Sequence, residues 1–110
     1  MNGTLITVTR KIGQNRGKPR LWIEGQTLID AGLPHGTRWD LCGVSPEGGF
    51  TILAIETGRR KVSGKPDRPV IDIAGSSLGA LGDEPSVALT YSPNSGHIVV
   101  RSNNQRNATL

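Results

Sequence analysis

The sequence predicts a mainly β domain built from two copies of one structural unit, and three observations lead to this prediction. The 110 residues include 15 glycines and 7 prolines, a composition that suits short strands joined by turns. Several short segments alternate apolar and polar residues, which is typical of half-buried strands. The third observation is that the residues around Arg10 return in the same order around Arg60.

The internal repeat has an offset of fifty residues, at which Arg10-Lys11-Ile12 is matched by Arg60-Lys61-Val62. The same offset matches Pro19, Ile23, Gly25 and Leu28 with Pro69, Ile73, Gly75 and Leu78. SPEGG at 45–49 then aligns with SPNSG at 92–96 after a small shift in register. We therefore expect a single domain at 1–103, made of repeats 5–54 and 55–101, with a flexible tail at 104–110.

Each repeat is expected to fold as a strand, a polar loop, a second strand, a short helix and a hairpin. The expected segments of the first repeat are the strand 5–12, the loop GQNRGK, the strand 21–23, the helix 26–31 ending at Gly32, and the hairpin of 39–44 with 50–55. Those of the second are the strand within 51–62, the loop SGKPDR, the strand 70–73, the helix 76–81 ending at Gly82, and the hairpin of 87–91 with 97–101. Gly32 and Gly82 are expected to be left-handed, as residues that end helices often are.

The basic side chains are concentrated in the two predicted loop regions, which hold ten of the thirteen lysines and arginines. With a net charge of +4 and a sequence pI near 9.8, this distribution favours a polyanionic partner. The candidate nucleic-acid-binding residues are Arg10, Lys11, Gln14, Asn15, Arg16, Lys18 and Arg20 in the first repeat, and Arg59, Arg60, Lys61, Lys65 and Arg68 in the second.

Two physical effects suggest duplex DNA as the partner. Each phosphate neutralised by a lysine or arginine releases condensed cations, which favours binding. The side chains of Gln14, Asn15 and Arg16 can also read base edges, since Asn and Gln pair with adenine and Arg with guanine. Single-strand binding by stacking is less favoured, because the basic loops hold no aromatic residue.

The other chemically distinctive residues indicate packing rather than catalysis. Trp22, Trp39, Phe50 and Tyr91 fall in strand segments and are expected in the core, as is the single cysteine, Cys42. His35 and His97 have no acidic partner at a strand or helix spacing, and the aspartates are scattered. We therefore expect no catalytic site, no bound metal and no cofactor.

The segment RLWIEGQTLIDAGLPHGTRWDL resembles the AbrB/MazE/SymE superfamily of swapped-hairpin domains, and is most similar to its SymE-like branch. In that superfamily two chains interleave their hairpins in one barrel. The resemblance implies, with the repeat, a tandem swapped-hairpin pseudo-dimeric barrel with two short helices in one chain. A weaker similarity links KIGQNRGKPR to the amino-terminal segment of some phage-type cytosine-5 DNA methyltransferases.

The resemblance implies nucleic-acid binding through the basic loops, and three roles stay open. The first is a DNA-binding module, either a regulator or the recognition domain of a larger DNA-modifying protein. The second is a protein-binding inhibitor of the antitoxin or phage type, and the third is a SymE-like RNA-acting toxin. We expect a cytoplasmic, prokaryotic or phage protein that is a monomer or a homodimer and has no membrane partner.

Overall fold

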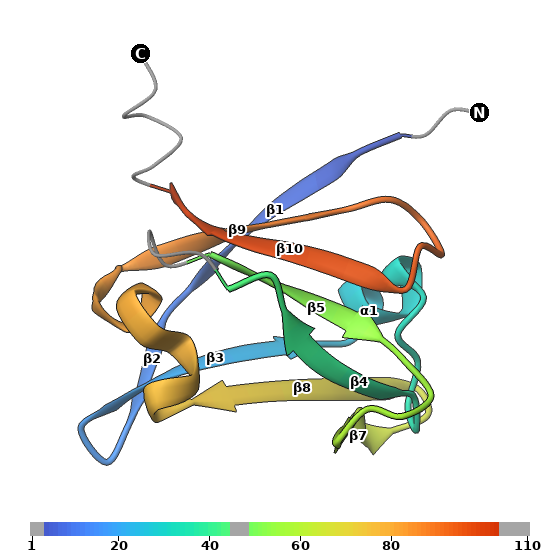
Figure 1. The fold of residues 1–110 in the computed structure, drawn as a ribbon, viewed down its shortest axis with the longest axis horizontal. Helices are drawn as coiled ribbons and strands as arrows, with labels where there is room; N and C mark the ends of the chain where they lie inside the picture. The colour runs from blue at the N-terminus through green and yellow to red at the C-terminus, as the bar shows by residue number, and fades with distance from the viewer. Residues whose placement is uncertain (1–3, 45–48, 104–110) are drawn as a thin grey trace.

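The computed structural model describes residues 4–44 and 49–103, which form two antiparallel sheets. The strand order is β1-β9-β10-β5-β4-β6 in the six-stranded sheet and β2-β3-β8-β7 in the four-stranded sheet. Figure 1 shows the six-stranded sheet above the four-stranded one. The prediction of a mainly β fold is confirmed.

The strand bounds match most of the expected segments. The six-stranded sheet contains β1 (Ile6–Lys11), β4 (Arg38–Cys42), β5 (Phe50–Ala54), β6 (Arg60–Lys61), β9 (Ser86–Tyr91) and β10 (His97–Ser102). The four-stranded sheet contains β2 (Gly13–Asn15), β3 (Lys18–Glu24), β7 (Ser63–Lys65) and β8 (Arg68–Ala74). Both predicted hairpins, β4–β5 and β9–β10, pair antiparallel. Most of the SPEGG connection, and the predicted tail, lie outside the described residues.

The core lies between the sheets and is built by the alternation of the strands. Leu21 and Ile23 of β3 are fully buried, as are Ile71 and Ile73 of β8. The predicted core aromatics Trp39, Phe50 and Tyr91 are buried among them. Cys42 does not belong to this core: it ends β4 and is exposed, which corrects the expectation of a buried thiol.

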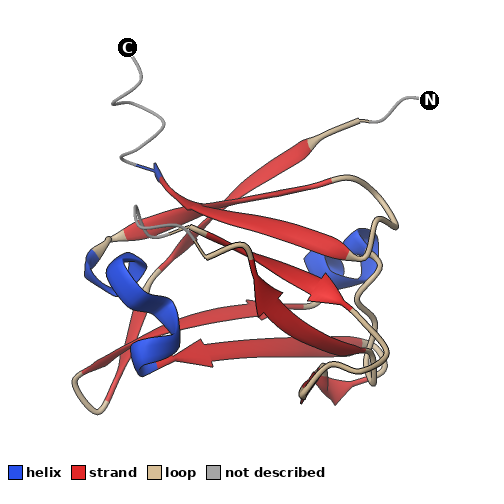
Figure 2. Cartoon of the chain, viewed as in Figure 1, coloured by secondary structure: helices blue, strands red, loops and turns tan. Residues whose placement is uncertain are grey.

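Two helical segments lie at opposite ends of the molecule (Figure 2). The helix α1 (Gln26–Ala31) has the predicted bounds and ends at Gly32, whose φ of 85° is left-handed. The second segment, η1 (Gly75–Asp83), is a 3-10 helix broken by Gly79, and Gly82 is not left-handed. Three glycines in GSSLGALGD lower the propensity for an α-helix, so only the first of the two predicted helices is α-helical.

The expected closed barrel is wrong, because the strands form two separate sheets. The chain passes from one sheet to the other at Ile12, between β1 and β2, and at Val62, between β6 and β7. Ile12 N–H donates to the Pro85 carbonyl, Val62 N–H donates to the Thr37 carbonyl, and the Val62 carbonyl accepts from Gly36 N–H. Among the described residues the two sheets share no ladder and each keeps two open edges.

The outer strands of the six-stranded sheet pair across the two halves of the chain. β1 pairs with β9, where Arg10 is opposite Val87, and β6 pairs with β4, where Arg60 is opposite Trp39. When each strand is replaced by its counterpart in the other repeat, both strand orders read the same from either end. Each half therefore supplies strands to both sheets.

Candidate nucleic-acid interface

The predicted loop GQNRGK is a β-hairpin in the structure. Asn15 pairs with Lys18, so the connection is the two residues Arg16 and Gly17. Their φ angles of 56° and 78° are both positive, as a type I′ turn requires, and this turn matches the twist of the strands. The turn leaves Arg16 exposed at its tip.

The predicted loop SGKPDR is also a hairpin, with a different turn. Lys65 pairs with Arg68 around Pro66 and Asp67. Proline fixes φ near −65°, so this turn cannot be type I′. The positive φ instead falls on Gly64, at 83°, and a Cβ there would overlap the Arg68 carbonyl oxygen. The two hairpins thus present similar charges on different backbones.

The two hairpin turns lie at opposite ends of the four-stranded sheet, because β3 and β8 run antiparallel (Figure 1). Glu24, at the end of β3, pairs with Val70 near the start of β8. At about 3.3 Å per residue along these strands, Lys18 and Arg68 lie roughly 25 Å apart, and the tips a little farther. This spacing approaches one turn of duplex DNA, about 34 Å.

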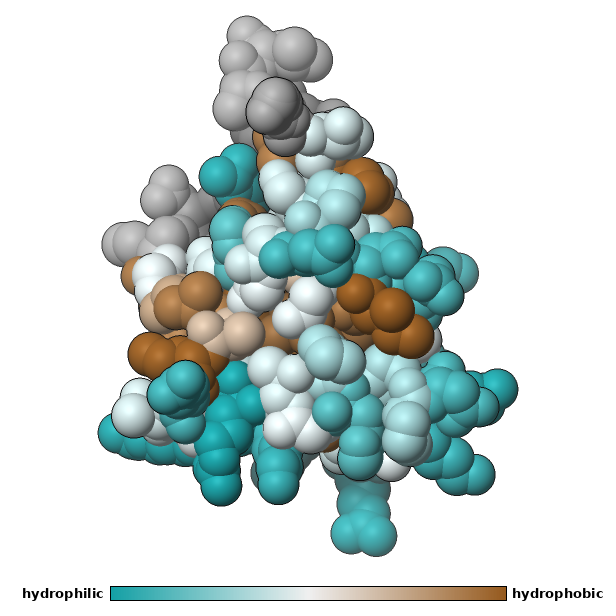
Figure 3. Space-filling view, turned by 90° about the vertical axis from the view of Figure 1, so that its right-hand side faces the viewer, coloured by the Kyte–Doolittle hydropathy of each residue, from teal (hydrophilic) through white to brown (hydrophobic). Residues whose placement is uncertain are grey.

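The face of the four-stranded sheet that points away from the core is called here the outer face. Alternation along the strands and the register between them place on it Gly13, Asn15, Lys18, Arg20, Trp22, Glu24, Ser63, Lys65, Arg68, Val70, Asp72 and Ala74, of which Val70 is buried. Figure 3 shows hydrophilic side chains covering the lower part of the molecule, at the height of this sheet. Within the described residues, the side chains of Lys18, Lys65 and Arg68 make no hydrogen bond or ion pair.

The centre of the outer face holds a cluster of Trp22, Arg20 and Asp72. The Arg20 Nε and Nη2 atoms each donate to one Asp72 carboxylate oxygen at 2.8 Å. The Arg20 Cζ atom lies 4.5 Å from the centre of the Trp22 ring. The hydrogen bond to Asp72 raises the pKa of Arg20 above its ordinary value, so this side chain stays charged.

Trp22 corrects the expectation that all four aromatic residues pack in the core, since 41% of it is exposed. It lies between the buried residues Leu21 and Ile23, so strand alternation turns it to the opposite face. The sequence Leu-Trp-Ile already indicated this orientation, because the middle of three consecutive strand residues points away from its two neighbours. Its pairing with Asp72, by contrast, depends on the register between β3 and β8.

Two of the predicted binding residues make internal contacts instead of projecting into solvent. The Arg10 guanidinium donates to the Thr27 hydroxyl at 3.0 Å, and Arg60 donates to the Ser77 hydroxyl at 3.2 Å. The Arg60 Cζ atom also lies 5.3 Å from the centre of the Trp39 ring. Both arginines brace a helical segment, which leaves less of their hydrogen-bonding capacity for a ligand.

The other predicted residues are exposed but do not all share the outer face. Lys11, Arg59 and Lys61 are exposed in or beside the edge strands β1 and β6. Gln14 pairs with Pro19 while Asn15 pairs with Lys18, so the two amides point to opposite faces of β2. Only Asn15 lies on the outer face.

Neither a candidate metal cluster nor a candidate membrane-spanning helix is found among the described residues. No group of three or more His, Cys, Asp and Glu residues among them could hold a metal ion. His35 is exposed and His97 is half-buried at the start of β10. No helix in the described part of the chain has the length and apolar character needed to span a membrane.

No protein-family model matches the sequence, and no curated protein or solved structure matches it. The features that bear on function are therefore the charge and geometry of the two hairpins and of the outer face.

Proposed function

We propose that this protein is a nucleic-acid-binding module that grips the phosphates of duplex DNA with its two basic hairpins. The observation that carries the proposal is the presence of cations without protein partners at both ends of one exposed sheet face. Among the described residues, Arg16 and Lys18 at one end and Lys65 and Arg68 at the other make no side-chain hydrogen bond or ion pair.

The energetic basis is the release of counterions from DNA. Four cations held by the backbone of two short hairpins lose little conformational freedom in their main chain on binding. Each phosphate contact makes the slope of log K against log salt more negative by about 0.9. The spacing of the tips, roughly 25 to 30 Å, lets both hairpins meet successive turns of one duplex.

The finer architecture is part of the same proposal. The chain is a covalent pseudo-dimer of two swapped-hairpin units, like the AbrB/MazE/SymE superfamily that the sequence resembles. The crossed pairing of β1 with β9 and of β6 with β4 supports this, since each unit completes the sheet of the other. In this arrangement the two hairpins are related by a pseudo-twofold axis between β3 and β8. The module then serves as a regulator or as the recognition domain of a larger DNA-modifying protein.

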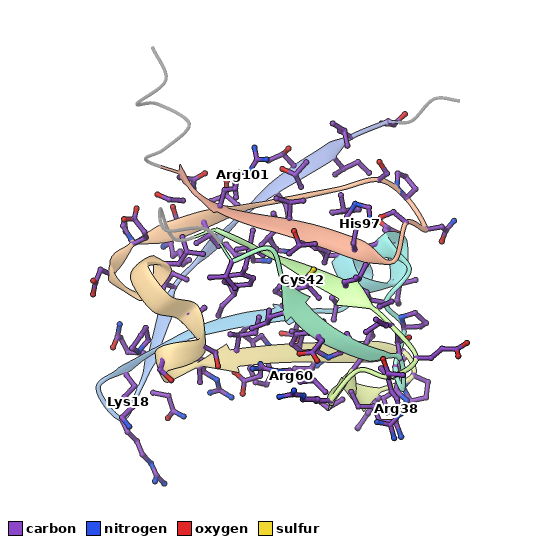
Figure 4. The ribbon with its side chains drawn as sticks, in the orientation of Figure 1. Lys18, Arg38, Cys42, Arg60, His97 and Arg101 are labelled. Carbon is purple, nitrogen blue, oxygen red and sulfur yellow. The ribbon has the colours of Figure 1, made fainter. Side chains whose placement is uncertain are left out.

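Salt titrations of duplex binding, followed by fluorescence anisotropy, test the proposal. The double variants Arg16→Gln/Lys18→Gln and Lys65→Gln/Arg68→Gln should each weaken binding. Each should also make the negative slope of log K against log salt shallower by about 2. Arg101→Gln is the matched control, because Arg101 is an exposed cation on β10 in the other sheet (Figure 4). This control should keep the slope of the parent.

Two results would contradict the proposal. One is the absence of binding to duplex DNA at low salt, and the other is an unchanged slope in both double variants. If an acidic protein is bound instead, and the same variants weaken that binding, the basic hairpins serve a protein-binding inhibitor. Single-stranded DNA and RNA are measured beside the duplex to rank the nucleic acids.

A further inference from the structure

The cluster at the centre of the outer face presents two planar groups. Trp22 is exposed over 41% of its surface on a sheet face whose other side chains are polar or small, apart from the buried Val70. The Arg20 guanidinium lies 4.5 Å from the centre of its ring, the separation of a stacked pair. Unpaired nucleobases stack on aromatic rings and on guanidinium planes.

The hydrogen bonds of Arg20 determine which of its surfaces is available. Its Nε and Nη2 atoms are both engaged by the Asp72 carboxylate at 2.8 Å. This bidentate geometry is the one an arginine uses for a phosphate, so one of the two bidentate edges of Arg20 is already occupied. The same contact with Asp72 holds the guanidinium plane in one orientation, and a planar ligand can stack on that plane.

The residues beside Arg20 leave room for a flat ligand. In the register of the sheet, Arg20 is flanked by Gly13 on β2 and Ala74 on β8, the two smallest kinds of side chain. Charge complementarity favours a nucleotide, because the uncommitted cations Lys18 and Arg68 lie toward the two ends of the same face. Phosphates several nucleotides to either side of a base on the cluster would then lie toward these cations.

We infer that the Trp22–Arg20 cluster is a stacking site for an unpaired nucleobase, located between the two phosphate-binding hairpins. This inference rests on the proposed function and names its ligand more narrowly: a strand with an extruded, bulged or single-stranded base. DNA and RNA present the same planar group to this site, and experiment distinguishes the two backbones.

The test compares oligonucleotides that differ only in pairing. The probes are a paired duplex of about two helical turns, the same duplex with one central unpaired thymine, and the matching single strands of DNA and RNA. The protein variants are Trp22→Ala, which removes the ring, and Arg20→Lys, which keeps the charge but removes the guanidinium plane. Trp22→Phe retains an aromatic ring and is the matched control. Thermal unfolding midpoints verify that each variant is folded.

We expect the parent to bind the bulged duplex more tightly than the paired one. Trp22→Ala should weaken binding of the bulged duplex about 5- to 150-fold, the range found when a stacking ring is removed, and leave the paired duplex unchanged. Arg20→Lys should weaken binding of the bulged duplex and leave binding of the paired duplex unchanged. Trp22→Phe should retain most of the parent's affinity for the bulged duplex. The preferred backbone is that of the single strand, DNA or RNA, which the protein binds with higher affinity.

Equal affinity of the parent for paired and bulged duplexes would overturn the inference and leave the proposed function standing. So would variants of Trp22 and Arg20 that weaken both duplexes by the same factor. If no probe binds at any salt concentration, both the inference and the proposed function are wrong.

Discussion

At the residue scale, the two basic hairpins depend on glycines for different reasons. Gly17 has a φ of 78°, but a Cβ at this position would meet no atom within 4 Å. Gly64 has a φ of 83°, and a Cβ there would also overlap the Arg68 carbonyl oxygen. The first glycine is needed for its backbone angle alone, whereas the second is also needed for the close approach of β7 to β8.

Alanine substitutions at these two glycines should therefore differ in cost. Gly17→Ala should lower the free energy of unfolding by about 1 to 2 kcal/mol, the cost of a left-handed alanine. Gly64→Ala should lower it by about 2 to 5 kcal/mol, because overpacking against a main-chain atom is added to that cost. Urea unfolding of both variants measures the difference. Equal losses would show that the β7–β8 turn relaxes to admit the extra methyl group.

At the element scale, each helical segment is tied to an edge strand by an arginine. Arg10 of β1 donates to Thr27 in α1, and Arg60 of β6 donates to Ser77 in η1. The sequence offset of fifty residues relates the two arginines and also the two hydroxyls. The same contact is therefore made in equivalent places of the two repeats, and it directs both cations toward the helical segments.

Removing the two hydroxyl groups should show how much the Arg10–Thr27 and Arg60–Ser77 hydrogen bonds contribute to stability. Thr27→Val and Ser77→Ala should each lower the free energy of unfolding by about 1 kcal/mol, as expected for one partly exposed hydrogen bond. Combining each with Arg10→Gln or Arg60→Gln gives a double-mutant cycle that isolates the pair. A coupling energy within error of zero in both cycles would mean that the arginines hold their positions without these bonds. DNA affinity should change little in the hydroxyl variants, since Thr27 is buried and distant in sequence from the hairpin turns.

At the scale of the whole molecule, the crossed pairing makes the two halves interdependent. β1 pairs along its length only with β9, and the short β6 pairs only with β4, within the described residues. The exposed segment 55–57 connects the halves. About fifty residues with incomplete sheets bury too little apolar surface to be stable alone.

Cutting the chain after residue 57 should show this dependence. Fragments 1–57 and 58–110 should each lack the circular dichroism of a β-sheet at low micromolar concentration. An equimolar mixture should recover the signal of the intact protein, because each fragment supplies strands that the other lacks. A fragment that folds alone as a monomer would contradict the pseudo-dimeric architecture. Sedimentation of the mixture establishes the stoichiometry of the complex.

Local features of the sequence were sufficient for much of the fold. Alternation of apolar and polar residues predicted the strands except β2 and β7, which were expected as loops. The helix α1 was predicted with its bounds because QTLIDA is followed by a glycine able to take a left-handed angle. The positions of the basic residues at two turns were also predictable, since charge and turn residues are local properties. The second expected helix forms as the 3-10 helix η1, because its segment GSSLGALGD contains three glycines. The expected burial of Cys42 was wrong, because this residue lies at an exposed strand end.

The sequence by itself determined most of the strands, the repeat and the places where charge is concentrated, because each depends on neighbouring residues. Only the tertiary structure decided that the sheets stay open, that Arg10 and Arg60 face the helical segments, and that Arg20 meets Asp72. Arg20 and Asp72 are 52 positions apart in the chain and come together through the register of β3 against β8. That register is set by burying Leu21 and Ile23 against the rest of the core, a long-range condition that no short stretch of sequence expresses.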